Sequence, residues 1–368
     1  MAAKASTTSS NELAARAYDA IIVGAGFSGL YQLHKLRDEL GLNARLLEKG
    51  GGIGGTWYWN RYPGARCDSE SYYYCYSFNK EIEQQWEWTE RYPEHTEIRK
   101  YLNFVADRLD LKRDIQLDTK VTSAAFDEAT NTWTVRTEKG ETFAAPFLIT
   151  AVGCLSTANV PKFKGLESFG GKWYHTGAWP HEGVDFAGKR VGQIGTGSTG
   201  IQAAPVIAEQ AKHLTVFQRT ANYSIPARNA PVTFADIKLT RDNYDDVWRR
   251  ARASTNGHPF TVSERSALSV SEKEREELYE KAWKRGGLRF RGTFNDVLSN
   301  VKANDTLELP PQENQGGSQG RQGRRDADPA RPWVRDQASA NRHELFRDFQ
   351  PRQRPSRGCQ AGTDRRDH

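Results

Sequence analysis

Two glycine-rich loops carry the residue spacing that binds phosphate in this 368-residue chain. Residues 24–29 and residues 195–200 both read G-x-G-x-x-G. Each loop follows a predicted strand and precedes a helical pattern, so that backbone N–H groups at the helix start face a pyrophosphate. The chain is therefore predicted to bind two dinucleotides.

The first loop has a separate task for each of its glycines. Gly24 permits the tight turn, Gly26 lets the pyrophosphate approach the backbone, and Gly29 lets the helix pack closely on the strand. Glu48 ends the next apolar run about twenty residues later, where an acidic side chain binds ribose hydroxyls. We therefore expect Glu48 to hold the ribose of the first dinucleotide.

The second loop differs at the corresponding position. Its second strand ends in Gln218, Arg219 and Thr220, with no acidic residue. The planar guanidinium group of arginine donates paired hydrogen bonds to phosphate, whereas a carboxylate would repel it. Arg219 therefore predicts a 2′-phosphate and hence NADP as the second dinucleotide.

The hydrophobic pattern predicts the elements that position these loops. Continuous apolar runs are typical of parallel strands that are buried on both faces. We expect strands at 20–23, 44–47, 131–137, 146–153, 190–194 and 213–217, a helix at 30–40, and a helix through Ile201 and Ala208. Charged helical pattern follows over residues 222–294. The predicted fold class is α/β, with two Rossmann-like dinucleotide-binding domains and a helical insertion.

Two further strings carry a family resemblance. Residues 54–64 read G-G-x-W-x-x-x-R-Y-P-G, and residues 169–180, here called the connector motif, read F-x-G-x-x-x-H-x-x-x-W-P. Both strings resemble motifs of the Baeyer–Villiger monooxygenases, as does the run from Arg66 to Asp68. This resemblance favours FAD over NAD in the first site.

The resemblance implies cofactor contacts, residue by residue. In the FAD site these are Gly24, Gly26, Ser28, Gly29, Glu48, Thr56, Trp57, Tyr58, Trp59, Arg66, Cys67, Asp68, Tyr74 and Val121. In the NADP(H) site they are Gly195, Thr196, Gly197, Ser198, Thr199, Gly200, Ile201, Gln202, Arg219 and Thr220. Asp68 is also expected to balance the charge of an active-site arginine, which makes it one of two catalytic candidates.

His175 of the connector motif is the other catalytic candidate. The pKa of a histidine suits a general base. However, His175 precedes the second nucleotide domain and lies among residues of turn shape and packing, such as Gly171 and Trp179. We therefore favour a hinge that responds to cofactor binding over proton transfer.

The resemblance implies an FAD-dependent enzyme that converts ketones to esters or lactones with NADPH and O2, through a C4a-peroxyflavin. A small-molecule ketone and O2 are the expected partners, and no metal is expected. Two alternatives stay open: a related flavin monooxygenase that oxidises nitrogen or sulfur, and an inactive nucleotide-binding remnant. The ketone and the oligomeric state are not predicted.

Composition bears on the binding partners and on the cellular compartment of the protein. The net charge is +6, but no basic stripe with interleaved aromatic residues predicts nucleic-acid binding. The four cysteines form no C-x-x-C pair, which is typical of a reduced cytosolic protein. No signal peptide and no membrane-spanning run are recognisable, so we expect a cytoplasmic protein without membrane contact.

The expected domains are a flexible N-terminus (1–17), the first part of an FAD-binding domain (18–154), an NADP-binding domain with the helical insertion (155–306) and a tail unlike the family (307–368). The tail is rich in Gln, Gly and Arg, a composition typical of disorder. It lacks the G-T-K-R run that carries the family's catalytic arginine.

Codons chosen for residues 344–354, read one base later, give N-Y-F-E-T-F-N-R-D-N-V, which the family shows after that arginine. We hypothesise a single-base frameshift near Leu307, and the nucleotide sequence of the gene tests it. The truncated product is expected to fold poorly or to bind FAD weakly, because sheet edges and apolar faces would lie uncovered.

Overall fold

The computed structural model describes residues 16–219 and 224–307. Its contacts divide the chain into two units, Met1–Phe217 with Asn229–Pro259 and Gln218–Arg228 with Phe260–His368. The two units are described separately. Thr220, residues 1–15 of the expected flexible N-terminus (1–17) and residues 308–368 of the expected tail (307–368) lie outside the described residues. Residues 16 and 17, which were expected to be flexible, instead form a short strand.

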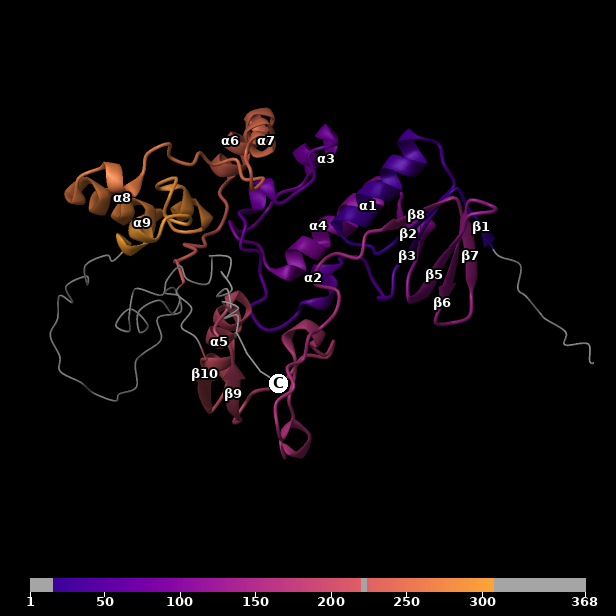
Figure 1. Cartoon of the computed structure of the whole chain (residues 1–368), viewed down its shortest axis with the longest axis horizontal. Coiled ribbons are helices and arrows are strands. Elements are labelled where there is room, and N and C mark those ends of the chain that lie inside the picture. Colours follow the sequence, from indigo (N-terminus) through magenta and orange to yellow (C-terminus); the bar gives the residue numbers. More distant parts are fainter. Residues whose placement is uncertain (1–15, 220–223, 308–368) are drawn as a thin grey trace, which may run out of the picture. The chain divides into compact units, whose positions relative to one another are not determined.

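The first sheet forms from the most apolar runs of the sequence. Strands β2 (Ala20–Val23), β3 (Ala44–Leu47), β4 (Ile115–Gln116) and β8 (Phe147–Thr150) lie parallel in the order β4-β3-β2-β8. The predicted strands 20–23 and 44–47 are confirmed to the residue. Figure 1 shows this sheet beside helix α1.

Helix α1 (Phe27–His34) follows the first glycine loop and continues through a π-helical turn, Lys35–Glu39. The helix expected over 30–40 therefore begins three residues earlier, because the last residues of the loop already form its first turn. Leu30 and Leu33 are buried in a core shared with the α4 helix (His95–Arg108). Two shorter helices, α2 (Thr56–Trp59) and α3 (Lys80–Gln85), lie between these elements in the chain.

A second sheet covers the other face of β2 and β3. Its order is β1-β7-β6-β5, formed by β1 (Arg16–Ala17), β7 (Thr142–Ala145), β6 (Thr132–Thr137) and β5 (Val121–Asp127). Ile21 and Leu47 are fully buried against Val135 and Phe143 of this sheet. Both faces of the first parallel sheet are thus covered.

The second glycine loop lies between β9 (Arg190–Ile194) and α5 (Ser198–Gln210), and the parallel strand β10 (His213–Phe217) follows. Both predicted strands are confirmed to the residue. Ala203 and Ile207 of α5 pack against Val191 and Leu214. This strand–loop–helix–strand unit repeats the local order of the first site.

The helical insertion divides between the two units. Helices α6 (Phe234–Asp242) and α7 (Tyr244–Ala253) belong to the first unit, where Trp248 of α7 donates a hydrogen bond from Nε1 to the buried Glu83. Helices α8 (Glu272–Arg285) and α9 (Val301–Asp305) belong to the second unit, with a core around Tyr279.

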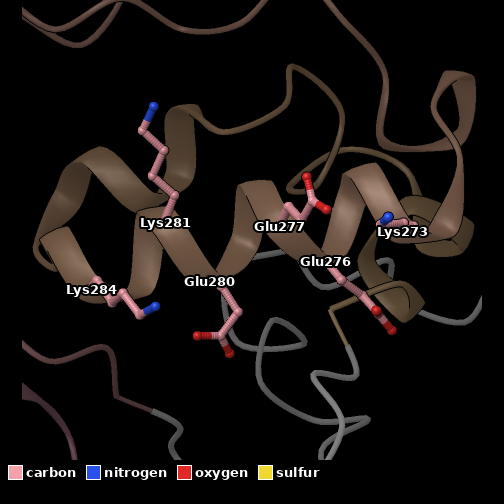
Figure 2. A pocket seen from close by; sticks show the side chains of 6 residues that line it. All are labelled: Lys273, Glu276, Glu277, Glu280, Lys281 and Lys284. Carbon is pink, nitrogen blue, oxygen red and sulfur yellow. The ribbon is translucent and has the colours of Figure 1, made fainter.

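The outer surface of α8 carries only charged side chains, drawn in Figure 2. Glutamate precedes lysine by four residues at Glu277 and Lys281 and again at Glu280 and Lys284, a spacing that stabilises a solvated helix. No aromatic or branched aliphatic side chain lines this surface. Within the described chain, no helix combines the length and apolar character needed to span a bilayer.

Candidate functional site

The first glycine loop has the close contacts that its pattern predicts. Gly24 has a φ of 107°, in the region that favours glycine. A Cβ on Gly24 would lie 2.6 Å from the Ala151 carbonyl oxygen, and one on Gly29 would lie 1.8 Å from the Gly24 carbonyl oxygen. Both positions therefore exclude any side chain.

The start of α1 is free to face an anion. Gly26 is the N-cap and supplies no side-chain cap, and the first turn contains no acidic residue. The first N–H groups of a helix have no partner within it, and its dipole favours negative charge there. Ser28 lies exposed in this turn. The loop thus fits a pyrophosphate.

Glu48 joins the glycine loop to the end of β3. Its side chain is buried, with Oε2 accepting from the Ala25 backbone N–H at 2.7 Å and Oε1 accepting from the Gly50 N–H at 2.7 Å. A carboxylate offers about four lone-pair positions, so each oxygen can still accept a ribose hydroxyl. Glu48 therefore has a structural role in addition to the predicted binding role.

The glycine–aromatic loop, residues 54–64, packs directly on the first glycine loop. A Cβ on Gly55, whose φ is 53°, would lie 2.8 Å from the Gly26 Cα atom. Helix α2 begins at the next residue, so the predicted contacts Thr56 to Trp59 start beside the phosphate loop. Trp57 is buried and donates from Nε1 to the Tyr74 hydroxyl at 3.1 Å.

Tyr58 lies at the centre of a group that the sequence did not reveal. The guanidinium groups of Arg61 and Arg99 lie 4.9 and 5.1 Å from the centre of its ring. The ring of His181, directly after the connector motif, lies 5.3 Å from that of Tyr58 and 6.2 Å from that of Trp59. In the sequence, only the place of His181 directly after Pro180 of the connector motif could have suggested that it belongs to this group.

Burial suppresses the ionisation of two residues predicted to lie in the FAD site. Burial raises the pKa of the Cys67 thiol to about 12, and it raises the pKa of the Tyr74 phenol to about 12. Neither group ionises near neutral pH, so each acts as a neutral group that packs and forms hydrogen bonds: the Tyr74 hydroxyl accepts from Trp57, and the Cys67 sulfur accepts from the Ser69 N–H. Cys67 is consequently no nucleophile.

The second glycine loop repeats the geometry of the first. Gly195 also has a φ of 107°, and a Cβ on Gly200 would lie 2.4 Å from the Gly195 carbonyl oxygen. Gly197 is the N-cap of helix α5 and supplies no side-chain cap, and the first turn of the helix contains no acidic residue. Thr196 is buried, whereas Ser198 and Ile201 are exposed.

The two sites differ where their second strands end. Glu48 is buried at the first site, whereas Arg219 is exposed two residues beyond β10. An exposed guanidinium is free to pair with a phosphate. Thr220, expected to share this role, lies outside the described residues.

Gln202 connects the two sites. Its Oε1 accepts from the Tyr62 hydroxyl at 2.7 Å and from the Arg66 N–H at 3.3 Å, while its Nε2 donates to Asp68 Oδ1 at 2.9 Å and to the Arg66 carbonyl at 3.2 Å. All four hydrogen-bonding positions of the amide are thus used. A Cβ on Gly64 would lie 2.3 Å from the Gln202 carbonyl oxygen, so α5 lies directly on the 62–68 loop.

Three further residues that were predicted to contact the cofactors are Thr199, Arg66 and Val121, and they have different surroundings. Burial raises the pKa of Tyr62, and a hydrogen bond with Thr199 opposes that rise, so Thr199 also reaches the junction. Arg66 forms ion pairs with Glu90 and Glu94, each at 3.0 Å. Val121 lies apart from the loops, at the start of β5, where it packs beside the Ile21 cluster.

The connector motif is largely exposed and is held at its C-terminal end by Trp179. The Phe169 ring lies where a Cβ on Gly171 would come within 2.8 Å of it, and Trp179 is buried with Tyr174 at 5.6 Å between ring centres. His175 Nδ1 accepts from the Gly177 N–H at 3.1 Å, so its neutral ring carries the proton on Nε2. In the part of the chain that the structure describes, this side chain bonds only within its own turn.

These features define a class: an α/β chain with two Rossmann-like dinucleotide folds joined at one side-chain junction. A family model described as flavin-binding monooxygenase-like matches residues 17–232. That match covers more than half of the chain, and the chain belongs to this family. The described residues contain no cluster of three His, Cys, Asp or Glu side chains that could hold a metal ion.

Similar proteins add detail. The chain is 50% identical over 290 residues to a Baeyer–Villiger monooxygenase of Pseudooceanicola batsensis, covering 78% of this chain and 53% of that one. It is 47% identical over 289 residues to the phenazine N-monooxygenase PhzNO1 of Lysobacter antibioticus, covering 78% and 53%. A solved structure of an oxidized steroid monooxygenase bound to NADP is 54% identical with a TM-score of 0.75, covering 79% and 55%. The chain thus spans about half the length of these relatives.

Proposed function

We propose that this chain carries the FAD- and NADP-binding part of an NADPH- and O2-dependent monooxygenase that oxidises ketones to esters or lactones. One observation supports this most directly. The first glycines of the two loops share a φ of 107°, but the second strands that follow them lead to opposite charges, a buried carboxylate at Glu48 and an exposed guanidinium at Arg219. That pair suits one dinucleotide held by its ribose and another held by a 2′-phosphate.

In this proposal the residues of the first site bind, orient and exclude water. The free N–H groups at the start of α1 face the pyrophosphate, and Glu48 accepts the ribose hydroxyls. The buried rings of Trp57 and Tyr58 exclude water on the side of the glycine–aromatic loop. A bound flavin supplies the electron transfer from NADPH and the activation of O2.

The catalytic candidates have positioning roles in the proposal. One carboxylate oxygen of Asp68 accepts a hydrogen bond from the Gln202 side-chain amide. The carboxylate therefore lies at the junction of the two sites, where it can balance a nearby positive charge. His175 is held by its own turn, which supports the hinge that we favour over a general base. Both roles remain predictions.

The assignment of NADP is tested by changing Arg219 to alanine. We expect the apparent Kd for NADPH to rise about 10- to 100-fold, because a guanidinium–phosphate pair is lost. The Kd for NADH, which lacks the phosphate, should stay within about twofold. Isothermal titration of both nucleotides measures this, and equal weakening of both would contradict the assignment.

A second candidate activity is oxidation of nitrogen in aromatic amines or heterocycles. The observation in its favour is the 47% identity to the phenazine N-monooxygenase. Product analysis with cyclic and aryl ketones against phenazine separates the two activities. NADPH oxidation without an oxygenated product from either class would favour the inactive nucleotide-binding remnant.

A further inference from the structure

Two buried polar atoms beside helix α3 have no hydrogen-bond partner among the described residues. They are Glu83 Oε2 within the helix and Trp86 Nε1 at its end. The Glu83 side chain has no exposed surface. The rings of Trp88, Tyr101 and Phe104 surround the Trp86 indole, with ring centres 5.3–5.6 Å away. Because buried polar groups in native proteins are almost always paired with protein or with water, each atom needs a partner.

The neighbouring side chains leave both atoms able to form a further hydrogen bond. Glu83 Oε1 accepts from Trp248 Nε1, whereas Oε2 lies 3.3 Å from the ammonium group of the exposed Lys80. A carboxylate oxygen has two lone pairs, so Oε2 can still accept a hydrogen bond beside that ion pair. The Trp86 indole N–H is a donor only and requires an acceptor.

Both residues line one small cavity. Its volume is about 10 Å³, and its lining also includes Cys75, Tyr101 and Tyr244, which carry a thiol and two hydroxyl groups. This volume is on the scale of a single water molecule, and a buried water typically makes about three hydrogen bonds. The Cys75 sulfur lies 4.0 Å from the Tyr244 hydroxyl, so further hydrogen-bonding groups stand at the same wall.

The two unpaired atoms select the kind of occupant. It must accept from an N–H group and donate to a carboxylate oxygen at the same time. An ammonium or alkali cation would pair with Glu83 but could not accept from Trp86. A chloride ion would accept from Trp86 but could not donate to Glu83. Among species of this size, water does both.

We propose that this cavity binds one water molecule, which accepts a hydrogen bond from Trp86 Nε1 and donates one to Glu83 Oε2. The site lies where helix α7 packs on α3, because Tyr244 lines the cavity and Trp248 of the same helix bonds Glu83 directly. All of these residues belong to the first unit. The water thus completes the polar contact that holds α7 of the helical insertion on the segment around α3.

Nuclear magnetic resonance of the full 368-residue chain with isotope-labelled tryptophan indoles tests the proposal. The signal that is missing from Trp86→Phe identifies the Trp86 indole proton. We expect a cross-relaxation peak between this proton and the water resonance, with the sign of a bound water rather than that of proton exchange. No flavin or nucleotide is added, so the outcome does not depend on the proposed activity. Absence of this peak would overturn the proposal.

A matched pair of substitutions locates the water. Cys75→Val adds a methyl group at the cavity and should abolish the cross peak while the folded pattern of indole signals is retained. Cys154→Val, at an exposed position, should leave the peak unchanged. Equal peaks in the two variants would place the water elsewhere and contradict the proposal.

Exchange of the buffer ions separates water from a bound ion. Replacing chloride by sulfate, or sodium by choline, should leave the chemical shift of the Trp86 indole proton unchanged. A shift that follows either ion would identify an ion in the cavity and refute the assignment of water.

Discussion

Replacement of Glu48 gives the sharpest test of how the first site is built. Its two carboxylate oxygens each accept one backbone N–H at 2.7 Å, from Ala25 in the glycine loop and from Gly50 after β3. The side chain is buried, so solvent neither screens these bonds nor replaces them readily.

The magnitude follows from the number of bonds. A hydrogen bond to a charged group contributes about 1.5–3 kcal/mol, so Glu48→Ala, which removes two, should lower the free energy of unfolding by about 3–6 kcal/mol. Glu48→Gln keeps one carbonyl acceptor but turns an amide donor toward the other N–H. It should therefore lower the free energy of unfolding by about half as much.

Urea unfolding followed by tryptophan fluorescence measures both values. Glu128→Ala, at an exposed turn position, is the control and should stay within about 0.5 kcal/mol of the unsubstituted protein. If Glu48→Ala unfolds at the same urea concentration as Glu128→Ala, the carboxylate does not hold the loop and the reasoning is wrong.

Two further substitutions or reactions probe the junction and the buried thiols. Gln202→Ala should lower the free energy of unfolding by about 2–6 kcal/mol in the same urea assay, because four hydrogen bonds of about 0.5–1.5 kcal/mol each are lost. Gln210→Ala at the exposed end of α5 should change it little, and equal effects of the two substitutions would rule out the junction. After the fourth cysteine is replaced by serine, a thiol reagent should label exposed Cys154 rapidly in the native protein. Cys67 and Cys75 should stay slow from pH 7 to about pH 10, since burial raises the pKa of each thiol to about 12 and the reactive thiolate forms only above that range; fast labelling of either at pH 8 would contradict it.

Local pattern was sufficient to predict the strands that carry the glycine loops. Strand β2 lies on a continuous apolar run, because a parallel strand buried on both faces tolerates few polar residues. Strands β9 and β10 are mostly exposed and contain Arg190, Gln193 and His213, so their positions followed from the neighbouring glycine loop rather than from a buried apolar run. The start of α1 was predicted three residues late, since Phe27 and Ser28 lie within the glycine pattern yet already have helical conformation.

Contacts between distant segments were beyond the reach of the sequence. The bonds of Gln202 reach residues 134 to 140 positions away, and no spacing rule encodes them. The same holds for Arg99 and His181 around Tyr58: Arg99 comes from α4, and His181 directly follows the connector motif. The roles of the individual cofactor contacts, the domain boundaries and the frameshift near Leu307 stay predictions.

The central claim is that one chain binds FAD at the Glu48 site and NADPH at the Arg219 site, and that electrons pass from one to the other. The direct measurement is anaerobic mixing of FAD-saturated protein with NADPH while the visible absorbance of the flavin is recorded. We predict protein-bound flavin whose absorbance is lost with NADPH, and much more slowly with NADH. A protein that remains colourless in excess FAD, or bound flavin that NADPH leaves oxidised, would contradict the claim.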